Sequence, residues 1–166
     1  MSPVALRPYI RADAERCAEI FRASIEELAA EDYDEEQREA WAARADDEQA
    51  FGARLAEALT LLAVIDGAVA GFASLKGADQ IDMVFVDPEF ARQGAGATLV
   101  EALTKLAQAR GAKRLTVDAS DTARPLFERQ GFTGERRNLV SVGDQWLANT
   151  TMTKTLGADP APPTRH

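Results

Sequence analysis

The chain has 166 residues, 46% of them hydrophobic, and a formal net charge of -8. This size and apolar content predict one folded domain and exclude a disordered chain. The excess of acidic residues argues against nucleic acid as a partner, because its phosphate backbone would be repelled.

The first third of the chain is predicted to be mainly helical. A short strand over residues 4–10 precedes a helix over residues 12–30, in which apolar side chains recur at helical spacing. An acidic stretch over residues 31–36 leads into a second helix through Trp41, and a third helix runs from about residue 47 to 58.

The middle of the chain is predicted to form three antiparallel strands. Residues 61–65 and 68–75 flank Asp66-Gly67, a pair favoured in two-residue hairpin turns. A third strand over residues 80–86 ends at Asp87-Pro88, because proline cannot donate to a strand ladder.

A helix and the remaining strands complete the predicted fold. A helix over residues 94–110 is followed by a strand through Leu115 and Ala119, a short helix over residues 122–130, and two strands near residues 132–142 and 145–153. The strand-helix-strand unit implies one parallel pair. The predicted class is an α/β sandwich, with a mixed, mostly antiparallel central sheet and helices on both faces.

The ends of the chain carry no predicted anchor. We expect a single domain over residues 1–156 and a flexible tail over residues 157–166. The N-terminus lacks a signal-peptide apolar region and no apolar run has membrane-spanning length, so a soluble cytoplasmic protein with no membrane partner is expected.

Cysteine and histidine occur once each, as Cys17 and His166. A disulfide within the chain is therefore excluded, as is a triad that needs histidine, because His166 ends the predicted tail. No metal site is predicted. Cys17 lies in an apolar helical stretch and is expected to be a small core residue rather than a nucleophile.

The turn after the third predicted strand favours anion binding. It contains Gly94 and Gly96 and opens directly into a helix, where free backbone N–H groups can converge on a phosphate beside Arg92. A third glycine and the acidic residue of a dinucleotide-binding motif are missing, and so is the Gly-Lys-Ser/Thr of a P-loop.

Two segments of the sequence resemble the GNAT acetyltransferases. Residues 81–111 match the family's strand, glycine-containing loop and long helix, and residues 120–132 resemble its Asn-x-x-Ala-x-x-Leu-Tyr-x-x-x-Gly-Phe segment. The order of elements extends the resemblance over most of the chain. It implies an N-acetyltransferase that moves acetyl from acetyl-CoA to a primary amine by direct attack in a ternary complex.

The resemblance also implies a cofactor site. Backbone groups of Val84, Phe85 and Val86 are expected to pair with the acyl carbonyl and the pantetheine arm, as an added strand would. The other expected cofactor-binding residues are Arg92, Gln93, Gly94, Ala95, Gly96 and Ala97 around the pyrophosphate, Ser120 as a polar contact, and Phe127 along the pantetheine.

The catalytic residues depart from the family pattern. The tyrosine that often protonates the leaving thiolate corresponds to Phe127, and the usual asparagine to Ser120. Asp82 is a candidate base acting through water, expected on the same face as Val84; the alternative is a structural carboxylate. Tyr33 is a candidate acid, and its alternative is an aromatic anchor at a helix junction.

The acceptor is left open as a small-molecule, peptide or protein amine. The acidic stretch over residues 31–36 would attract a cationic acceptor or simply form a solvated helix start, and Trp41 and Trp146 would line the pocket or fill the core. The rival classes are a non-catalytic acyl-CoA-binding or regulatory module and an interaction protein that only shares the fold. The oligomeric state is also open, with a homodimer among the options.

Overall fold

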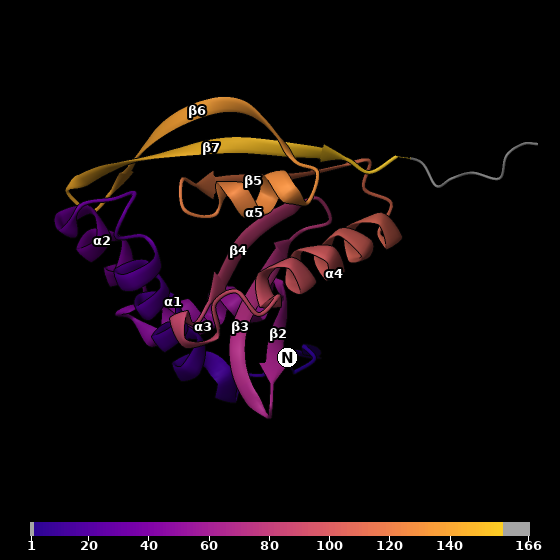
Figure 1. The fold of residues 1–166 in the computed structure, drawn as a ribbon, viewed down its shortest axis with the longest axis horizontal. Helices are drawn as coiled ribbons and strands as arrows, with labels where there is room; N and C mark the ends of the chain where they lie inside the picture. Colours follow the sequence, from indigo (N-terminus) through magenta and orange to yellow (C-terminus); the bar gives the residue numbers. More distant parts are fainter. Residues whose placement is uncertain (1, 158–166) are drawn as a thin grey trace, which may run out of the picture.

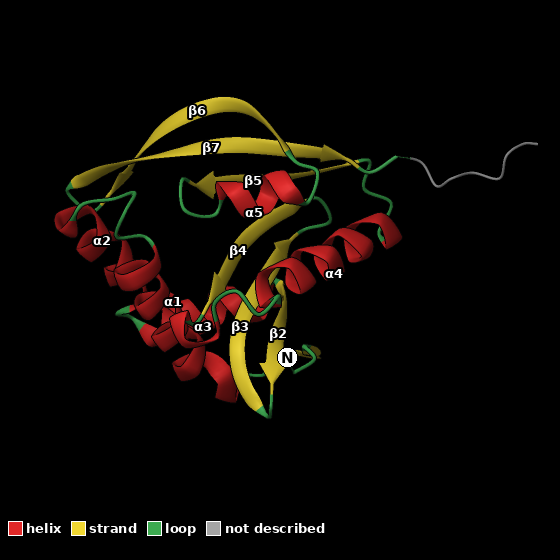
Figure 2. Ribbon diagram, in the orientation of Figure 1, coloured by secondary structure: helices red, strands yellow, loops and turns green. Residues whose placement is uncertain are grey.

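The computed structural model describes residues 2–157, so most of the predicted tail, His166 included, lies outside the described residues. A seven-stranded sheet with the order β1-β2-β3-β4-β5-β7-β6 forms the centre of the molecule (Figures 1 and 2). Its strands are β1 (Ala5–Pro8), β2 (Leu59–Ile65), β3 (Ala68–Lys76), β4 (Gln80–Val86), β5 (Arg114–Ser120), β6 (Thr133–Val142) and β7 (Gln145–Thr155). All neighbouring pairs are antiparallel except β4 and β5, which confirms the predicted mixed sheet.

Helices cover both faces of the sheet, as predicted. The α-helices are α1 (Ala14–Leu28), α2 (Glu35–Ala42), α3 (Glu48–Glu57), α4 (Ala95–Ala109) and α5 (Arg124–Arg129). Short 3-10 turns are η1 (Arg11–Asp13), η2 (Ala43–Ala45) and η3 (Pro88–Phe90). Figure 1 shows α1, α2 and α3 on one side and α4 on the other, with the β6–β7 hairpin arching across the top.

Two apolar clusters hold the helices to the sheet. On the α4 face, Leu99 and Leu103 are fully buried against inward residues of β3, β4 and β5. On the other face, Phe21 of α1 and Leu55 of α3 pack with Phe72 of β3. Each fully buried side chain of this size contributes about 1.5–3 kcal/mol.

The single cysteine belongs to the second of these clusters. Cys17 is fully buried, and burial raises the pKa of its thiol to about 12. A neutral, inaccessible thiol is a core residue, as predicted.

The β2–β3 hairpin turns at Asp66 and Gly67, which have φ values of 52° and 81°. Two successive left-handed residues match the right-handed twist of the strands, which explains why an Asp-Gly pair marks this turn in the sequence.

The one parallel pair within residues 2–157 is short, and the sheet opens beyond it. Strands β4 and β5 are paired at Gln80 with Thr116 and at Ile81 with Val117, and at no later residue. From Met83 onward β4 remains paired with β3, while β5 is paired with β7 up to Ser120. The two strands therefore diverge, as the splay between β4 and β5 in Figure 1 shows.

A β-bulge at Asp82 lies at the start of this divergence. Ser74 of β3 pairs with Met83 and Leu75 pairs with Ile81, so Asp82 is an extra residue without a partner. A bulge shifts the alternation of side chains. Asp82 bonds to Arg54 of α3, whereas Val84 packs on the α4 side. The prediction that Asp82 and Val84 share a face is therefore wrong.

Among residues 2–157, no helix combines the length and apolar character needed to cross a membrane.

Candidate active site

A cavity of about 540 Å³ occupies the space between the diverging strands. Its wall combines most of β4, the end of β5, the β6–β7 hairpin and the helices of the first third of the chain. Of the predicted site residues it contains Tyr33, Asp82, Val84, Phe85, Ser120 and Phe127. The fold thus brings together residues from both resembling segments and from the helical region.

The edge of β4 facing this cavity has free backbone groups. The N–H of Asp87 donates a hydrogen bond to the carbonyl of Ala70 (2.8 Å). The carbonyl oxygen of Phe85 is close to Gly71 of β3, because a Cβ atom added at Gly71 would lie 2.8 Å from it. The backbone groups of Phe85 and Asp87 therefore point toward β3. Because direction alternates along a strand, those of Val84 and Val86 point into the gap. Phe85, predicted to contribute its backbone, contributes its ring to the wall instead.

The turn that follows β4 is held by Asp87. Its carboxylate accepts the backbone N–H of Glu89 and forms an ion pair with Arg16 of α1. This fixes the direction in which the chain leaves the sheet, and places the beginning of α4 directly after the free edge.

Helix α4 begins with unbonded amides. Thr98 makes the first bond of the helix, to the carbonyl of Gly94 (3.0 Å), so the amides of Ala95, Gly96 and Ala97 precede the ladder. Gly94 has a φ of 88° and Arg92 a φ of 65°, a left-handed turn that exposes the helix end. Arg92 and Gly94 are exposed, Gln93, Gly96 and Ala97 are half-buried, and Ala95 is buried, so most of the predicted anion loop is accessible.

Gly96 has a packing role as well. A Cβ there would lie 3.1 Å from Leu126 of α5 and 3.7 Å from Val86. The missing side chain lets α4 approach β4 and α5 closely, which keeps the helix end beside the free strand edge.

Ser120 and Phe127 lie on the β5 side of the cavity. The Ser120 hydroxyl accepts the N–H of Ala123 (3.1 Å), which orders the connection to α5. Phe127 is 2% exposed and its ring packs edge-on against Phe132 at 5.2 Å. Phe127 therefore supplies an apolar surface, and the position offers no hydroxyl for proton transfer.

Asp82 is paired rather than free. Its two carboxylate oxygens accept hydrogen bonds from Nε (2.9 Å) and Nη2 (2.8 Å) of Arg54. Burial leaves 14% of the Asp82 side chain exposed, against 47% for Arg54. The hydrogen bonds that Arg54 donates to Asp82 raise the pKa of the Arg54 guanidinium, and the opposite charges of the pair cancel within the wall.

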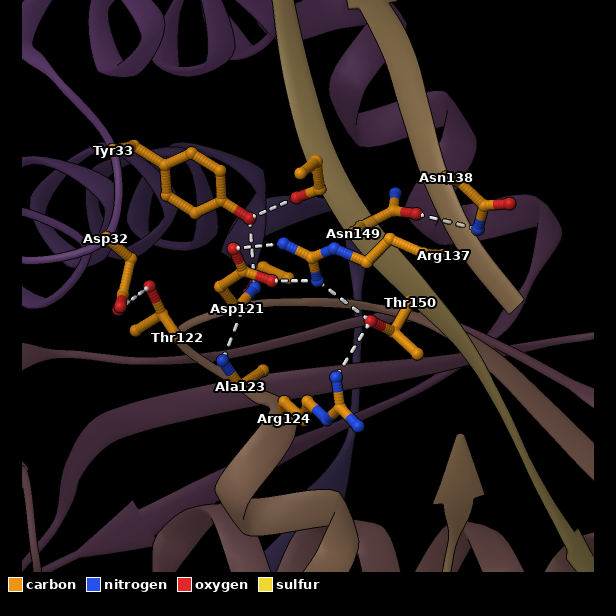
Figure 3. Close-up of polar contacts among 12 residues, drawn as sticks. Asp32, Tyr33, Asp121, Thr122, Ala123, Arg124, Arg137, Asn138, Asn149 and Thr150 are labelled. Carbon is orange, nitrogen blue, oxygen red and sulfur yellow. Dashed lines mark hydrogen bonds and ion pairs between the residues drawn. The ribbon is translucent and has the colours of Figure 1, made fainter. Parts of the chain in front are cut away.

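Tyr33 joins three separated segments. Its hydroxyl donates to the carbonyl of Ala148 in β7 (2.6 Å) and accepts the N–H of Asp121 (2.9 Å), as Figure 3 shows. The side chain is buried, and burial raises the pKa of the phenol although the Asp121 N–H opposes this. The hydroxyl proton of Tyr33 is therefore already donated to the carbonyl of Ala148.

The polar contacts around Tyr33 fix the loop between β5 and α5. Arg137 of β6 forms a bidentate ion pair with Asp121 (2.6 and 2.9 Å) and also donates to Thr150. On the other side, the hydroxyl of Thr122 donates to Asp32 (Figure 3). Together these contacts tie the loop both to the β6–β7 hairpin and to the segment before α2.

The acidic segment before α2 has structural contacts. Besides the bond from Thr122 to Asp32, the Asp34 side chain accepts the N–H of Gln37 and forms a capping box at the start of α2. These two carboxylates therefore stabilise the local fold.

The two tryptophans have different environments. Trp41 is half-buried and lines the cavity, with its ring edge-on to Tyr33 at 5.4 Å. Trp146 is 58% exposed on β7 and is not part of the wall. The prediction that Trp146 lines the pocket or fills the core is wrong, because its strand position faces outward in the β6–β7 hairpin.

Three charged residues in the wall were missed by sequence reasoning: Arg44, Arg54 and Asp118. For Asp118 a signal existed, since Leu115, Val117 and Ala119 alternate inward and leave it on the opposite face of the strand. Arg44 and Arg54 lie on helical segments whose position relative to β4 no local pattern predicts.

Comparison with known proteins identifies relatives over most of the chain. A family model described as "Acetyltransferase (GNAT) domain" matches residues 29–156. The protein of Escherichia coli (strain K12) described as "Uncharacterized N-acetyltransferase YafP" is 34% identical over 152 residues, which cover 92% of this chain and 96% of that protein.

Solved structures share the same arrangement. A protein of Rhodopseudomonas palustris, described as "GCN5-Related N-acetyltransferase: Aminotransferase, Class-II", is 57% identical with a TM-score of 0.91, over 93% of this chain and 97% of that chain. The PaiA N-acetyltransferase of Thermoplasma acidophilum, in complex with coenzyme A, is 20% identical with a TM-score of 0.76, over 92% of this chain and 99% of that chain. The second similarity concerns the fold alone.

Proposed function

Because the chain belongs to the GNAT acetyltransferase family, we propose that it transfers the acetyl group of acetyl-CoA to a primary amine by direct attack in a ternary complex. The acceptor amine enters from the side of α1–α3 and the β6–β7 hairpin. The cosubstrate lies along β4 and the beginning of α4.

The free edge of β4 that continues into unbonded amides of α4 carries this proposal. The gap beside Val84 and Val86 accepts an extended, amide-containing arm in the way that a sheet edge accepts a strand. The amides of Ala95, Gly96 and Ala97 at the helix N-terminus suit the diphosphate at the end of that arm, and Arg92 adds a positive charge. Ser120 and Phe127 border the arm from the β5 side.

The residues of the gap also serve the chemistry. Acetyl-CoA supplies a thioester, and attack by a neutral amine forms the amide bond while the carbon–sulfur bond breaks. Coenzyme A leaves as a thiolate, and the proton lost by the attacking nitrogen passes through water to the thiolate sulfur. A backbone N–H on the free edge of β4 can stabilise the oxyanion that forms during attack, because it is oriented before the substrate arrives.

Asp82 and Tyr33 have different proposed roles. Each carboxylate oxygen of Asp82 keeps a second lone pair beyond its bond to Arg54, so a water bound there can take the proton of the acceptor ammonium. The Tyr33 proton is held by Ala148, so we assign Tyr33 to positioning of the loop that carries Ser120 and Asp121.

The test combines binding with thiol release. Acetyl-CoA at about 100 times its dissociation constant should stabilise the protein by ~2.7 kcal/mol, which is a rise in melting temperature of about 5–10 °C for a domain of this size. A panel of amines should then release free thiol. A melting shift without thiol release would favour the non-catalytic acyl-CoA-binding module, and no shift at saturation would exclude both.

A further inference from the structure

Charged side chains in the cavity wall are few, and half of them neutralise each other. The wall contains Arg44, Arg54, Asp82 and Asp118, of which Arg54 and Asp82 form the bidentate pair. One positive and one negative group are left without a charged partner among residues 2–157. A bound acceptor would meet these two.

Asp118 lies at the point where the strands diverge. The parallel register pairs Ile81 with Val117 last, so Asp118 and Asp82 follow it on opposite sides of the opening. One oxygen of Asp118 accepts a hydrogen bond from the hydroxyl of Thr151 (2.7 Å), and the other accepts no hydrogen bond from residues 2–157. A carboxylate with a free oxygen beside the acyl-binding edge is a binding point for an ammonium group.

Arg44 lies on the helical side of the cavity. It belongs to η2, whose buried Ala45 carbonyl accepts a hydrogen bond from Arg22 of α1, so its backbone is fixed. Trp41 is three residues earlier in the same helical run and lines the same cavity, which places both side chains on one face. The Arg44 guanidinium is exposed and makes no hydrogen bond or ion pair with residues 2–157.

Aromatic rings form one part of the acceptor side. Phe21, Trp41 and Phe85 contribute rings that pack on one another, with centroids 4.7 Å apart for Phe21 and Phe85 and 6.1 Å for Trp41 and Phe85. The wall therefore suits a molecule with an apolar body and separate charged ends.

We propose that the acceptor is a small amine that also carries an anionic group at its other end, such as an amino acid whose reacting amine and carboxylate are separated by a carbon chain, with its ammonium at Asp118 and its anion at Arg44. This inference rests on the proposed acetyl transfer and specifies its substrate class. A diamine would bring a second positive charge close to Arg44, and Arg44 has no acidic partner among residues 2–157 that would offset the repulsion. An anion at Arg44 gains charge-assisted, bidentate hydrogen bonds.

The test uses pairs of amines that differ only in the carboxylate, for example 6-aminohexanoate with pentylamine and lysine with 1,5-diaminopentane. Free thiol released from acetyl-CoA is measured for each. We expect the carboxylate-bearing member to have the higher kcat/KM in the wild type. Arg44→Gln should lower its kcat/KM by roughly 10- to 100-fold, mainly through KM, and change that of the decarboxylated member less than about twofold.

Two further variants define the effect. Arg44→Lys should recover part of the preference, because it keeps the charge but not the planar fork. Arg11→Gln changes the net charge equally at an exposed η1 position outside the cavity wall and should leave all ratios unchanged. Differences in amine basicity cancel when one ratio is compared between variants.

The outcomes are separable. Thiol release that is equal for both members of each pair, or a ratio that Arg44→Gln leaves unchanged, would overturn the inference while acetyl transfer stands. Absence of thiol release with every amine would contradict the proposed function and the inference with it.

Discussion

The β4 edge and the α1–α3 side of the cavity offer a ligand different kinds of groups. Along β4 and the beginning of α4, the available groups are backbone amides and carbonyls, at Val84, Val86 and the first turn of α4. On the acceptor side they are side chains, such as Arg44 and Asp118. A backbone site depends on fold and on small residues, whereas a side-chain site can change with single substitutions. The first is therefore suited to a constant ligand and the second to a particular one.

The largest effect is expected from a charge placed in the backbone site. Ala97→Glu puts a carboxylate beside the proposed diphosphate position and should weaken acetyl-CoA binding by about 100-fold, measured by calorimetry. The fold should be retained, since acidic residues in the first turn stabilise helices. Ala109→Glu, exposed at the other end of α4, is the matched control and should bind acetyl-CoA as the wild type does. Equal binding by both variants would argue against the anion site.

Tyr33→Phe should have an intermediate effect, on stability rather than on catalysis. The change leaves the Asp121 N–H and the Ala148 carbonyl without their partner, which should lower the free energy of unfolding by about 2 kcal/mol. The shape of the pH–rate profile should not change. Loss of an alkaline limb in the variant would instead identify Tyr33 as the catalytic acid.

Stability at high pH offers a second measurement on this residue. Because burial raises the pKa of Tyr33 in the folded state, its contribution is complete below the unfolded phenol pKa of about 10 and is lost as pH rises through the folded value. The free energy of unfolding, measured with denaturant above pH 10, should therefore fall less steeply with pH for Tyr33→Phe than for the wild type.

The smallest stability effect is expected at the Arg54–Asp82 pair. Arg54 is half-exposed, so Arg54→Ala should cost only about 1 kcal/mol, and a double-mutant cycle with Asp82→Asn should give a coupling energy of similar size. The pH–rate profile of Asp82→Asn tests the role of this pair more directly than its stability does. If Asp82 is the base, Asp82→Asn changes the pH–rate profile, and an unchanged profile would remove it from that role.

Sequence patterns predicted the β4 edge and the beginning of α4 well. Apolar periodicity located every strand and α-helix, and Gly94 with Gly96 located the turn where free amides are exposed. These features are local, so local residue preferences suffice to find them.

The side chains on the acceptor side of the cavity were predicted poorly, because their directions depend on long-range contacts. The bulge at Asp82 reverses the expected face of that residue, and it is defined by pairing with β3 rather than by the residue itself. The guanidinium of Arg54 reaches Asp82 only because α3 packs over the sheet, with Leu55 buried in the same cluster as Leu62 of β2. The outward direction of Trp146 depends on how the β6–β7 hairpin lies over α2.

The short β4–β5 pairing has a mechanical consequence. Two paired positions join an antiparallel unit of β1 to β4 with a second unit of β5, β7 and β6. This seam is the part of the sheet with the fewest paired positions, so the buried side chains beneath α4, which come from both units, hold the two units together more than interstrand hydrogen bonds do. A ligand inserted beside Val84 and Val86 would add hydrogen bonds at the place where the sheet itself has fewest.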